Sequence, residues 1–317
     1  MTYGELCTTS NFTFLKGASH PEELVTRAAE LGLSAIAITD QNSLAGVVRA
    51  YAALQEIKRT ATEDIVIKST QQVDHSSRQV TQATSISRPD LGHHLPKLIV
   101  GARLVLQDCA VHWIALPKDR KGYEALSRLL TLGKRRAPKG QCHLSYRDLT
   151  EGGYGMTLIA IPQESYRDVA GHIAEMARVF PSNVYLGCAP RYDGSDQANF
   201  DRCMSLSHAT SAPMVAIGDV LMHHGSRRQL ADVLTCLREG CSIDDIGKRA
   251  LPNAERRLKG LQDMARLFRK HPAAIRRTQE IIAKCSFCLS ELSYEYPTEV
   301  SDGETAQDRL IRLTHQG

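Results

Sequence analysis

Short apolar runs alternate with amphipathic stretches over the first 220 residues. Patterns typical of buried strands lie at residues 6–9, 34–39, 97–106, 112–116, 156–161, 183–188 and 213–220. Helical patterns lie between most of them, at about residues 20–31, 43–58, 123–132, 167–180 and 195–209. This alternation favours parallel strands with helices outside. Some seven short strands are more typical of a closed α/β barrel than of a short open sheet.

Local signals support the first helix. Ser19 is predicted to cap it, with Pro21 in the first turn and Glu22 three residues after the serine, as in a capping box. Gly32 is predicted to end it.

Two regions depart from the alternation. Residues 59–95 are rich in Ser, Thr and Gln and show no sustained period, which predicts an exposed, mobile insertion. After residue 225 the pattern is nearly all helical. We therefore expect a barrel at 1–225, an appended helical region at 226–300, and at 301–317 the start of a following segment. A chain that stops there is expected to be the front part of a longer protein or a truncated product.

Composition fits an ordinary folded protein. The chain has 317 residues and is 42% hydrophobic, which suffices for a buried core. Its nine cysteines are scattered and favour reduced thiols, although a metal at the one C-x-x-C pair, Cys285 and Cys288, stays open. Neither a signal sequence nor an apolar stretch of about 18 to 20 residues is present, so a cytoplasmic protein without membrane contact is expected.

Positive charge is concentrated near the end of the chain. The net charge is only +4, but residues 253–288 hold nine Lys or Arg against three acids. Candidate nucleic-acid contacts in this stretch are Arg256, Arg257, Arg276 and Arg277. Solvated helix faces are the alternative interpretation.

Candidate chemistry lies at the carboxyl ends of strands, where barrel enzymes place their functional groups. Asp40 and Asp219 each follow a strand, although aspartates also cap helices and stop strands. His223 and His224 follow Asp219, and at most one of them can share its face. A metal-dependent phosphoesterase or 3′-5′ exonuclease that uses Asp40, Asp219 and His223 is therefore one hypothesis. The sequence contains no phosphate-binding P-loop, nucleophile elbow or zinc-binding helix motif.

These strand-end segments resemble the N-terminal polymerase-and-histidinol-phosphatase (PHP) domain of bacterial C-family DNA polymerases, and most closely the error-prone branch. The resemblance is carried by ordered segments along the whole chain, among them "AITDQNSLAGVVRAY", "GDVLMHH" and "DVLTCLREGC". It implies a distorted seven-stranded (β/α) barrel of PHP type followed by an appended helical region. It also implies a parent enzyme that copies damaged DNA with Mg and dNTPs, with DNA and other translesion or replication proteins as partners. The polymerase palm would lie beyond Gly317.

The resemblance further implies where metal ligands would stand, and this chain departs from most of them. Metal-competent PHP domains open with His-x-His, and the aligned triplet here is Cys7-Thr8-Thr9. Where the family has Asp, His, Glu and His, this chain has Lys16, Gln41, Arg103 and Leu221. Only Asp40 and Asp219 remain.

Charge then argues against a metal. Lys16 and Arg103 would stand where a divalent ion must sit, at a repulsion on the order of several kcal/mol. We expect no catalytic residue, no bound metal and no cofactor in this chain, which alone should be inactive. Lys16 or Arg103 is expected to pair with Asp40 or Asp219 instead. The leading hypothesis is a structural or docking role; a non-enzymatic DNA- or partner-binding module is a further alternative.

Overall fold

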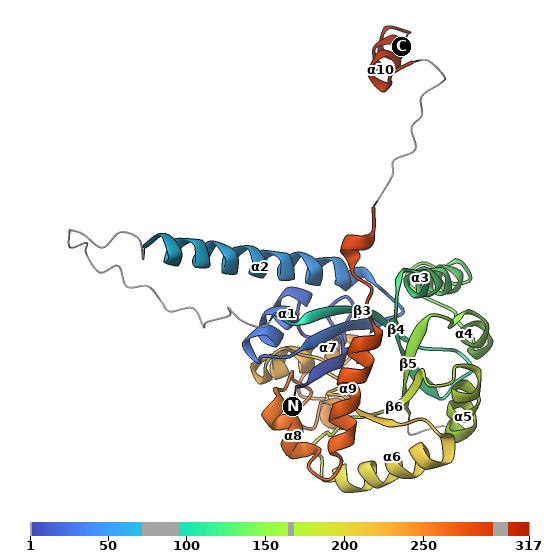
Figure 1. The fold of residues 1–317 in the computed structure, drawn as a ribbon. Helices are drawn as coiled ribbons and strands as arrows, with labels where there is room; N and C mark the ends of the chain where they lie inside the picture. The colour runs from blue at the N-terminus through green and yellow to red at the C-terminus, as the bar shows by residue number, and fades with distance from the viewer. Residues whose placement is uncertain (1, 72–94, 164–167, 294–303, 317) are drawn as a thin grey trace.

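The computed structural model describes residues 2–71, 95–163, 168–293 and 304–316, and within them the seven predicted strands form one curled sheet (Figure 1). The strands lie side by side in chain order. They are β1 (Gly4–Thr8), β2 (Ala35–Gln41), β3 (Lys97–Leu104), β4 (Val111–Pro117), β5 (Met156–Pro162), β6 (Val184–Cys188) and β7 (Met214–Ala216). The α/β class and the strand count predicted from the sequence are confirmed.

The expectation of parallel strands throughout was wrong at one strand. β4 is antiparallel to both β3 and β5, whereas the other neighbouring strands are parallel. Only residues 105–110 join β3 to β4, and they contain no helix. A parallel pair needs a crossover connection of a dozen or more residues, so a link this short returns the chain antiparallel.

The sheet closes into a barrel only at one end. β6 and β7 pair through three residues each, but β1 meets only the chain after β7, through the isolated bridge between Thr8 and Val220. The amide of Thr9 donates to the Val220 carbonyl at 2.9 Å, and the Val220 amide donates to the Cys7 carbonyl at 2.9 Å. The barrel is therefore distorted, with its seam held just beyond the carboxyl end of β1.

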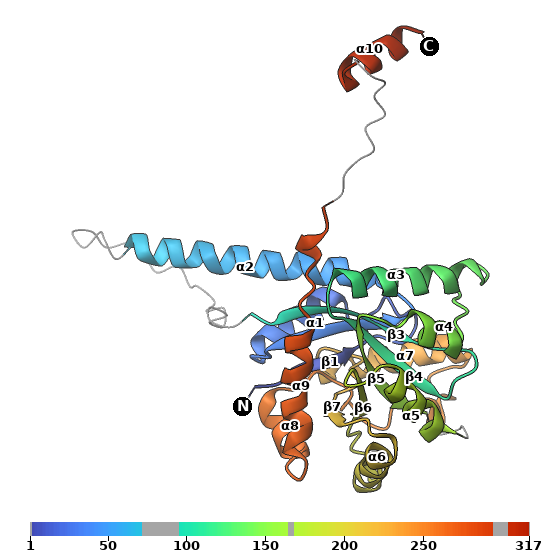
Figure 2. The ribbon, with the colours of Figure 1, turned by 45° about the vertical axis from the view of Figure 1, so that its right-hand side comes forward.

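The first six helices lie around the outside of this sheet, as two views of the ribbon show (Figures 1 and 2). The helices are α1 (Pro21–Glu30), α2 (Ala45–Gln71), α3 (Arg120–Arg135), α4 (Tyr146–Gly152), α5 (Val169–Val179), α6 (Asp196–Thr210), α7 (Arg228–Glu239), α8 (Leu261–Leu267), α9 (Pro272–Lys284) and α10 (Ala306–Gln316). Three-residue 3₁₀ turns occur at Gly225–Arg227, Gly247–Arg249 and Leu289–Glu291.

Alternate residues of each strand face two separate apolar layers, as the period of a strand requires. Ile36 and Ile38 of β2 pack outward against the helices, whereas Ala35 and Ala37 face the barrel interior. The interior layer includes Leu6, Ile99, Ile114, Ile159, Val215 and Ile217. Because both faces are buried, the strands are apolar along nearly their whole length, which is why they were visible as continuous runs in the sequence.

Helix α9 fills the end of the barrel opposite the seam. Its side chains Ile281 and Ile282, with the following Cys285, belong to the interior layer. Arg277 donates to the carbonyl of Met214, the first residue of β7, at 2.8 Å. The amine of Lys97, which begins β3, donates to the Ile282 carbonyl at 3.1 Å. This part of the expected helical region packs into the barrel itself.

Two details of the predicted helices need correction. The helix expected to stop at residue 58 continues to Gln71, within the predicted insertion; residues 72–94 lie outside the described part. Residues 255–260, predicted to belong to a helix, are irregular, and α8 begins only at Leu261. The division at residues 225 and 300 stays a prediction.

The cap of α1 also differs from the prediction. His20 occupies the N-cap position, and its amide donates to Glu23, rather than Glu22, at 2.9 Å. The hydroxyl of Ser19 is engaged elsewhere, because it accepts from the backbone amide of His223 at 2.9 Å.

One carboxyl group, Glu5, is fully buried inside the barrel. It accepts hydrogen bonds from the Tyr3 hydroxyl at 2.7 Å, the Cys7 amide at 3.0 Å and the Gly218 amide at 2.9 Å. Burial raises the pKa of Glu5 to about 7, although these hydrogen bonds and Lys259 act in the opposite direction.

This raised pKa predicts that Glu5 weakens the folded state as the pH rises. Between the unfolded pKa of about 4.3 and the folded pKa of about 7, the folded protein binds more protons than the unfolded chain. The free energy of unfolding of the wild type, relative to Glu5→Gln, should therefore fall by about 2 kcal/mol between pH 5 and pH 8. Urea unfolding of both proteins across this range measures the difference, and a constant difference would contradict it.

Candidate functional site

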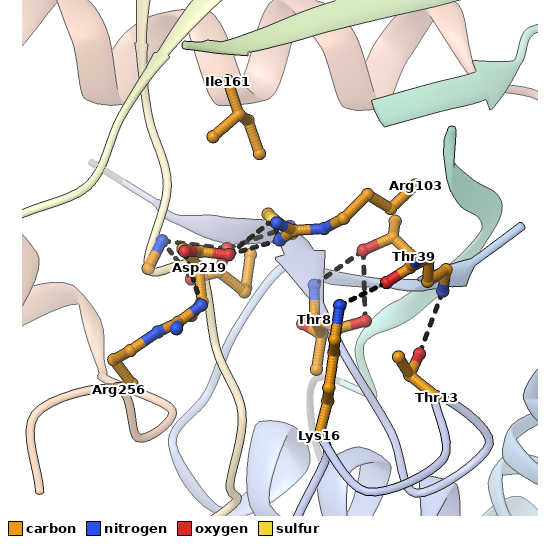
Figure 3. Close-up of polar contacts among 12 residues, drawn as sticks. Thr8, Thr13, Lys16, Thr39, Arg103, Ile161, Asp219 and Arg256 are labelled. Atoms are coloured by element: carbon orange, nitrogen blue, oxygen red, sulfur yellow. Dashed lines mark hydrogen bonds and ion pairs between the residues drawn. The ribbon is translucent and has the colours of Figure 1, made fainter. Parts of the chain in front are cut away.

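Asp219 is the centre of the candidate site. It lies three residues after β7, is buried, and adopts a positive φ of 46°. Arg103 from β3 and Arg256 from the segment before α8 reach its carboxylate from two sides (Figure 3). Arg103 Nη2 pairs with Oδ1, and Arg256 Nη2 lies 2.5 Å from Oδ2. Of the ion pairs expected from the sequence, the one between Arg103 and Asp219 is confirmed.

The two guanidinium groups keep Asp219 ionised. Burial by itself would raise the pKa of this carboxyl, but the charges of Arg103 and Arg256 outweigh burial and hold the pKa well below its usual range. Arg256 also donates from Nε to the Asp219 carbonyl at 3.0 Å, which fixes the backbone at this strained position.

Cys7 completes the contacts of this ion pair. Its Sγ accepts from Arg103 Nη2 at 3.0 Å and lies 3.6 Å from Asp219 Oδ1. Burial raises the pKa of the Cys7 thiol far above its ordinary value, despite the nearby Arg103. The thiol is therefore neutral, and thiolate chemistry is not expected from it.

Asp40, the other aspartate left at an aligned position, holds a loop. Its carboxylate accepts from the Ser10 amide at 2.8 Å, the Ser10 hydroxyl at 2.7 Å and the Thr13 hydroxyl at 2.8 Å. Burial raises its pKa, against the effect of these hydrogen bonds. These contacts fit the turn-stabilising alternative considered for this residue.

Lys16 does not pair with either aspartate. Its amine donates to the side-chain carbonyl of Gln41 at 2.6 Å (Figure 3). The loop that carries it is tight at Gly17, where a Cβ would lie 2.0 Å from the Ser10 carbonyl oxygen. A side chain larger than glycine would therefore displace Lys16 from the barrel mouth.

Six of the eight aligned positions meet in one cavity of about 420 Å³ at the carboxyl ends of the strands, here called the barrel-end cavity. These six are Thr9, Lys16, Gln41, Arg103, Asp219 and Leu221. Cys7 and Asp40 lie beside it, in contact with Arg103 and Thr13 respectively. Most of the positions aligned from the sequence therefore lie together in the fold, and Arg191, Arg238 and Arg249, which the sequence did not indicate, also line the cavity.

Of the two histidines described next, one lies outside the barrel-end cavity and one lines it. His223, considered as a partner of Asp219, instead hydrogen-bonds Ser19 through Nδ1 at 2.8 Å and lies 3.8 Å from Glu23. His112, which stood alone in the sequence, lines the barrel-end cavity. Burial, followed by the nearby Arg103 and Lys16, lowers its pKa to about 4. His93 and His94 lie outside the described residues.

In the described ranges, no group of three or more His, Cys, Asp or Glu side chains is close enough to hold a metal ion. All nine cysteines are free. Cys285 is buried, with its pKa raised to about 12 chiefly by that burial, whereas Cys288 is exposed.

The four arginines considered as nucleic-acid contacts do not share one surface. Arg256 holds Asp219, and Arg277 binds β7 at the opposite end of the barrel. Arg257 pairs with Asp263 at 3.2 Å, and Arg276 is exposed on α9. Contact between any of them and DNA stays a prediction.

Comparisons with known proteins agree on the family. A family model for the PHP domain matches residues 5–199. The error-prone DNA polymerase of Ruegeria pomeroyi is 64% identical over the whole chain, and that of Rhodopseudomonas palustris strain BisB5 is 41% identical over 99% of it. The chain spans 29% and 26% of the length of these two relatives.

Among solved structures, an amidohydrolase from Chromobacterium violaceum with bound sulfate and no metal aligns with a TM-score of 0.43. It is 13% identical, and the alignment covers 69% of this chain and 88% of that protein. Separately, no helix in the described part of the chain has the length and apolar character needed to span a membrane.

Proposed function

The chain belongs to the PHP domain family, and we propose that it is the N-terminal PHP part of an error-prone DNA polymerase, with a structural or docking role. The parent reaction would be DNA-directed DNA synthesis across damaged templates. That chemistry, with its Mg and dNTPs, would belong to the parts of the relatives that this chain does not span. DNA and other replication proteins would be partners of the longer protein.

The ion pair between Arg103 and Asp219 is the observation that carries the structural role. A divalent metal in this barrel needs imidazole and carboxylate ligands that converge on one point. The remaining carboxylates, Asp40 and Asp219, are instead held by hydroxyl groups and guanidinium groups respectively. The residues present therefore do not fit a metal centre.

Repulsion adds to the loss of ligands. An ion beside Asp219 would face the positive charges of Arg103 and Arg256, each at a cost on the order of several kcal/mol. The internal cations supply the positive charge that the buried carboxylate requires, so the fold has no need of a metal at this point.

Exposed apolar side chains support the docking part of the proposal. On α7, Leu230, Val233 and Leu237 are exposed at helical spacing, with Ile243 shortly after the helix. The relatives are more than three times as long as this chain, so the rest of such a protein could cover this face.

Metal analysis tests the proposal directly. Protein equilibrated with Zn and Mn and then dialysed should retain well under one metal ion per chain, because no ligand set replaces the arginines. It should also release no phosphate from nucleotides and degrade no DNA 3′ ends. Elemental analysis by mass spectrometry, combined with both assays, measures this; stoichiometric metal with either activity would favour the phosphoesterase or exonuclease alternative.

A further inference from the structure

Two cysteines, Cys188 and Cys203, bring their thiols together between the sheet and an outer helix. Cys188 is the last residue of β6, and Cys203 lies in the middle of α6. Both side chains are buried, and the two thiols form a hydrogen bond with each other. The fold therefore holds two free thiols in contact, although a loop and half a helix separate them along the chain.

The shared hydrogen bond makes the two thiols chemically unequal. It is the largest influence on both groups, and it lowers the pKa of Cys203 while it raises the pKa of Cys188. The positive charge of Arg202 also favours ionisation of Cys203, against the effect of burial. Because the thiolate is the nucleophilic form of cysteine, Cys203 is the nucleophile of the pair and Cys188 is the thiol that keeps its proton.

The other buried thiols lack this feature. Burial is the main cause of a raised pKa at five cysteines elsewhere in the described chain, which are Cys7, Cys109, Cys142, Cys236 and Cys285. Their thiols are therefore protonated and weakly nucleophilic at neutral pH.

Cys203 is also within reach of small solutes. It lines a cavity of about 200 Å³ at the start of α6. Asp193, Ser195 and Ala198 line the same cavity and are exposed, so it opens to solvent on that side. One water molecule occupies about 30 Å³ in the liquid, so this cavity has room for hydrogen peroxide beside the Cys203 thiol.

We propose that Cys188 and Cys203 form a redox site at which hydrogen peroxide converts the two thiols into a disulfide. Cysteines that respond to oxidants combine thiolate character, access to the oxidant and a second thiol close by. Cys203 meets the first two conditions, and Cys188 meets the third. This inference concerns the chemistry of the thiols and does not depend on the function proposed for the chain.

The reaction balances with the two thiols and one peroxide. The Cys203 thiolate attacks one peroxide oxygen, the O–O bond breaks, and the departing hydroxide takes up the proton that Cys203 lost on ionising. Cys203 is then a sulfenic acid. The Cys188 sulfur attacks the Cys203 sulfur, the S–O bond breaks, and the second hydroxide leaves as water with the Cys188 proton. The thiols together lose two electrons, the peroxide gains them, and the new bond ties the end of β6 to α6.

Peptide mapping of the whole chain tests the proposal. Reduced protein is treated with a stoichiometric amount of hydrogen peroxide, blocked with iodoacetamide in denaturant and digested with trypsin without reductant. The tryptic peptides 179–191 and 203–227 each contain one of the two cysteines and no other. Mass spectrometry should detect these peptides joined and two hydrogen atoms lighter than their sum, and dithiothreitol should separate them.

A second pair of thiols provides a control within the same sample. Cys236 and Cys241 also hydrogen-bond to each other, at the end of α7, and Cys241 is partly exposed. The Cys236 thiol lies 3.4 Å from the Ser242 carbonyl, to which it donates, and its pKa is raised. Each unit of pKa lowers the thiolate fraction about tenfold. The link between peptides 229–238 and 239–248 should therefore form about tenfold more slowly.

Variants assign the roles of the two cysteines. Cys188→Ser should stop the reaction at the sulfenic acid of Cys203, which dimedone traps, whereas Cys203→Ser should leave Cys188 unoxidised. The matched control is Cys285→Ser, which removes another buried thiol and should alter the yield of the linked peptide less than about twofold. Circular dichroism verifies that each variant is folded.

Three results would overturn the proposal. The first is the absence of the linked peptide from the wild type even at millimolar peroxide. The second is a main product in which Cys188 or Cys203 is joined to a different cysteine. The third is trapping by dimedone at Cys188 in Cys203→Ser, at the rate at which Cys203 is trapped in Cys188→Ser, since the two thiols would then be equally reactive.

Discussion

Replacing Arg103 by leucine is expected to lower the free energy of unfolding by about 3–5 kcal/mol, the usual range for breaking a buried ion pair. The side chains of Arg103 and Asp219 are 12% and 6% exposed, so little water screens the charge that remains. Arg256 alone would then compensate Asp219. Urea unfolding monitored by circular dichroism at pH 7 measures the loss.

A surface pair provides the matched control for this substitution. Arg27 and Glu30 of α1 lie 2.8 Å apart but are about one third exposed, so Arg27→Leu should change stability by no more than about 0.5 kcal/mol. Adding Asp219→Asn to Arg103→Leu should lower the stability further, because it leaves the Arg256 guanidinium without its carboxylate partner. An Arg103→Leu effect as small as that of Arg27→Leu would show that the pair does not stabilise the barrel.

Replacing Ile281 by alanine is expected to lower the free energy of unfolding by about 2–4 kcal/mol. Ile281 is fully buried in the interior layer, and alanine there would leave a cavity at the end of the barrel that α9 fills. Because α9 packs into the barrel, a single cooperative transition should shift as a whole. Chemical denaturation followed by both circular dichroism and tryptophan fluorescence of the buried Trp113 measures this.

The control for Ile281 is an apolar residue on an exposed helix face. Leu237 of α7 is 63% exposed, and Leu237→Ala should change stability by less than about 0.5 kcal/mol. If the Trp113 transition stayed unshifted in Ile281→Ala while helical signal was lost separately, α9 would be an appendage and not part of the barrel.

Strands were predictable in this chain because burial on both faces makes them continuously apolar. Ile36 and Ala37 of β2 face different layers, yet both are buried. The direction of β4 was harder to infer. It depends on the short connection between residues 104 and 111, which contains no helix, and not on any property of the strand itself. Helix α4 was missed although Ser145 and Asp148 form a capping box that was present in the sequence.

Only some residues of the site could be predicted from the sequence. Arg103 and Asp219 align with metal-ligand positions of the family. This placed a cation and a carboxylate at strand ends, and their ion pair could be inferred from it. Arg256 was interpreted as a surface cation, because its neighbours in the sequence are mostly Lys and Arg. Nothing in that stretch indicates that its side chain reaches Asp219, 37 residues earlier in the chain. Arg238 and Arg249 likewise enter the barrel-end cavity from outside the strands, where no periodic pattern fixes their direction.

The seam between Thr8 and Val220, and the filling of the opposite end by α9, have a consequence for the order of folding. β1 is the first strand to leave the ribosome, yet its partner across the seam is more than 200 residues later, and the helix that covers its other end is later still. Contacts this distant in sequence form slowly. During synthesis, β1 must therefore remain with one edge unpaired until Val220 has emerged, and the nascent barrel is most exposed to aggregation in that interval.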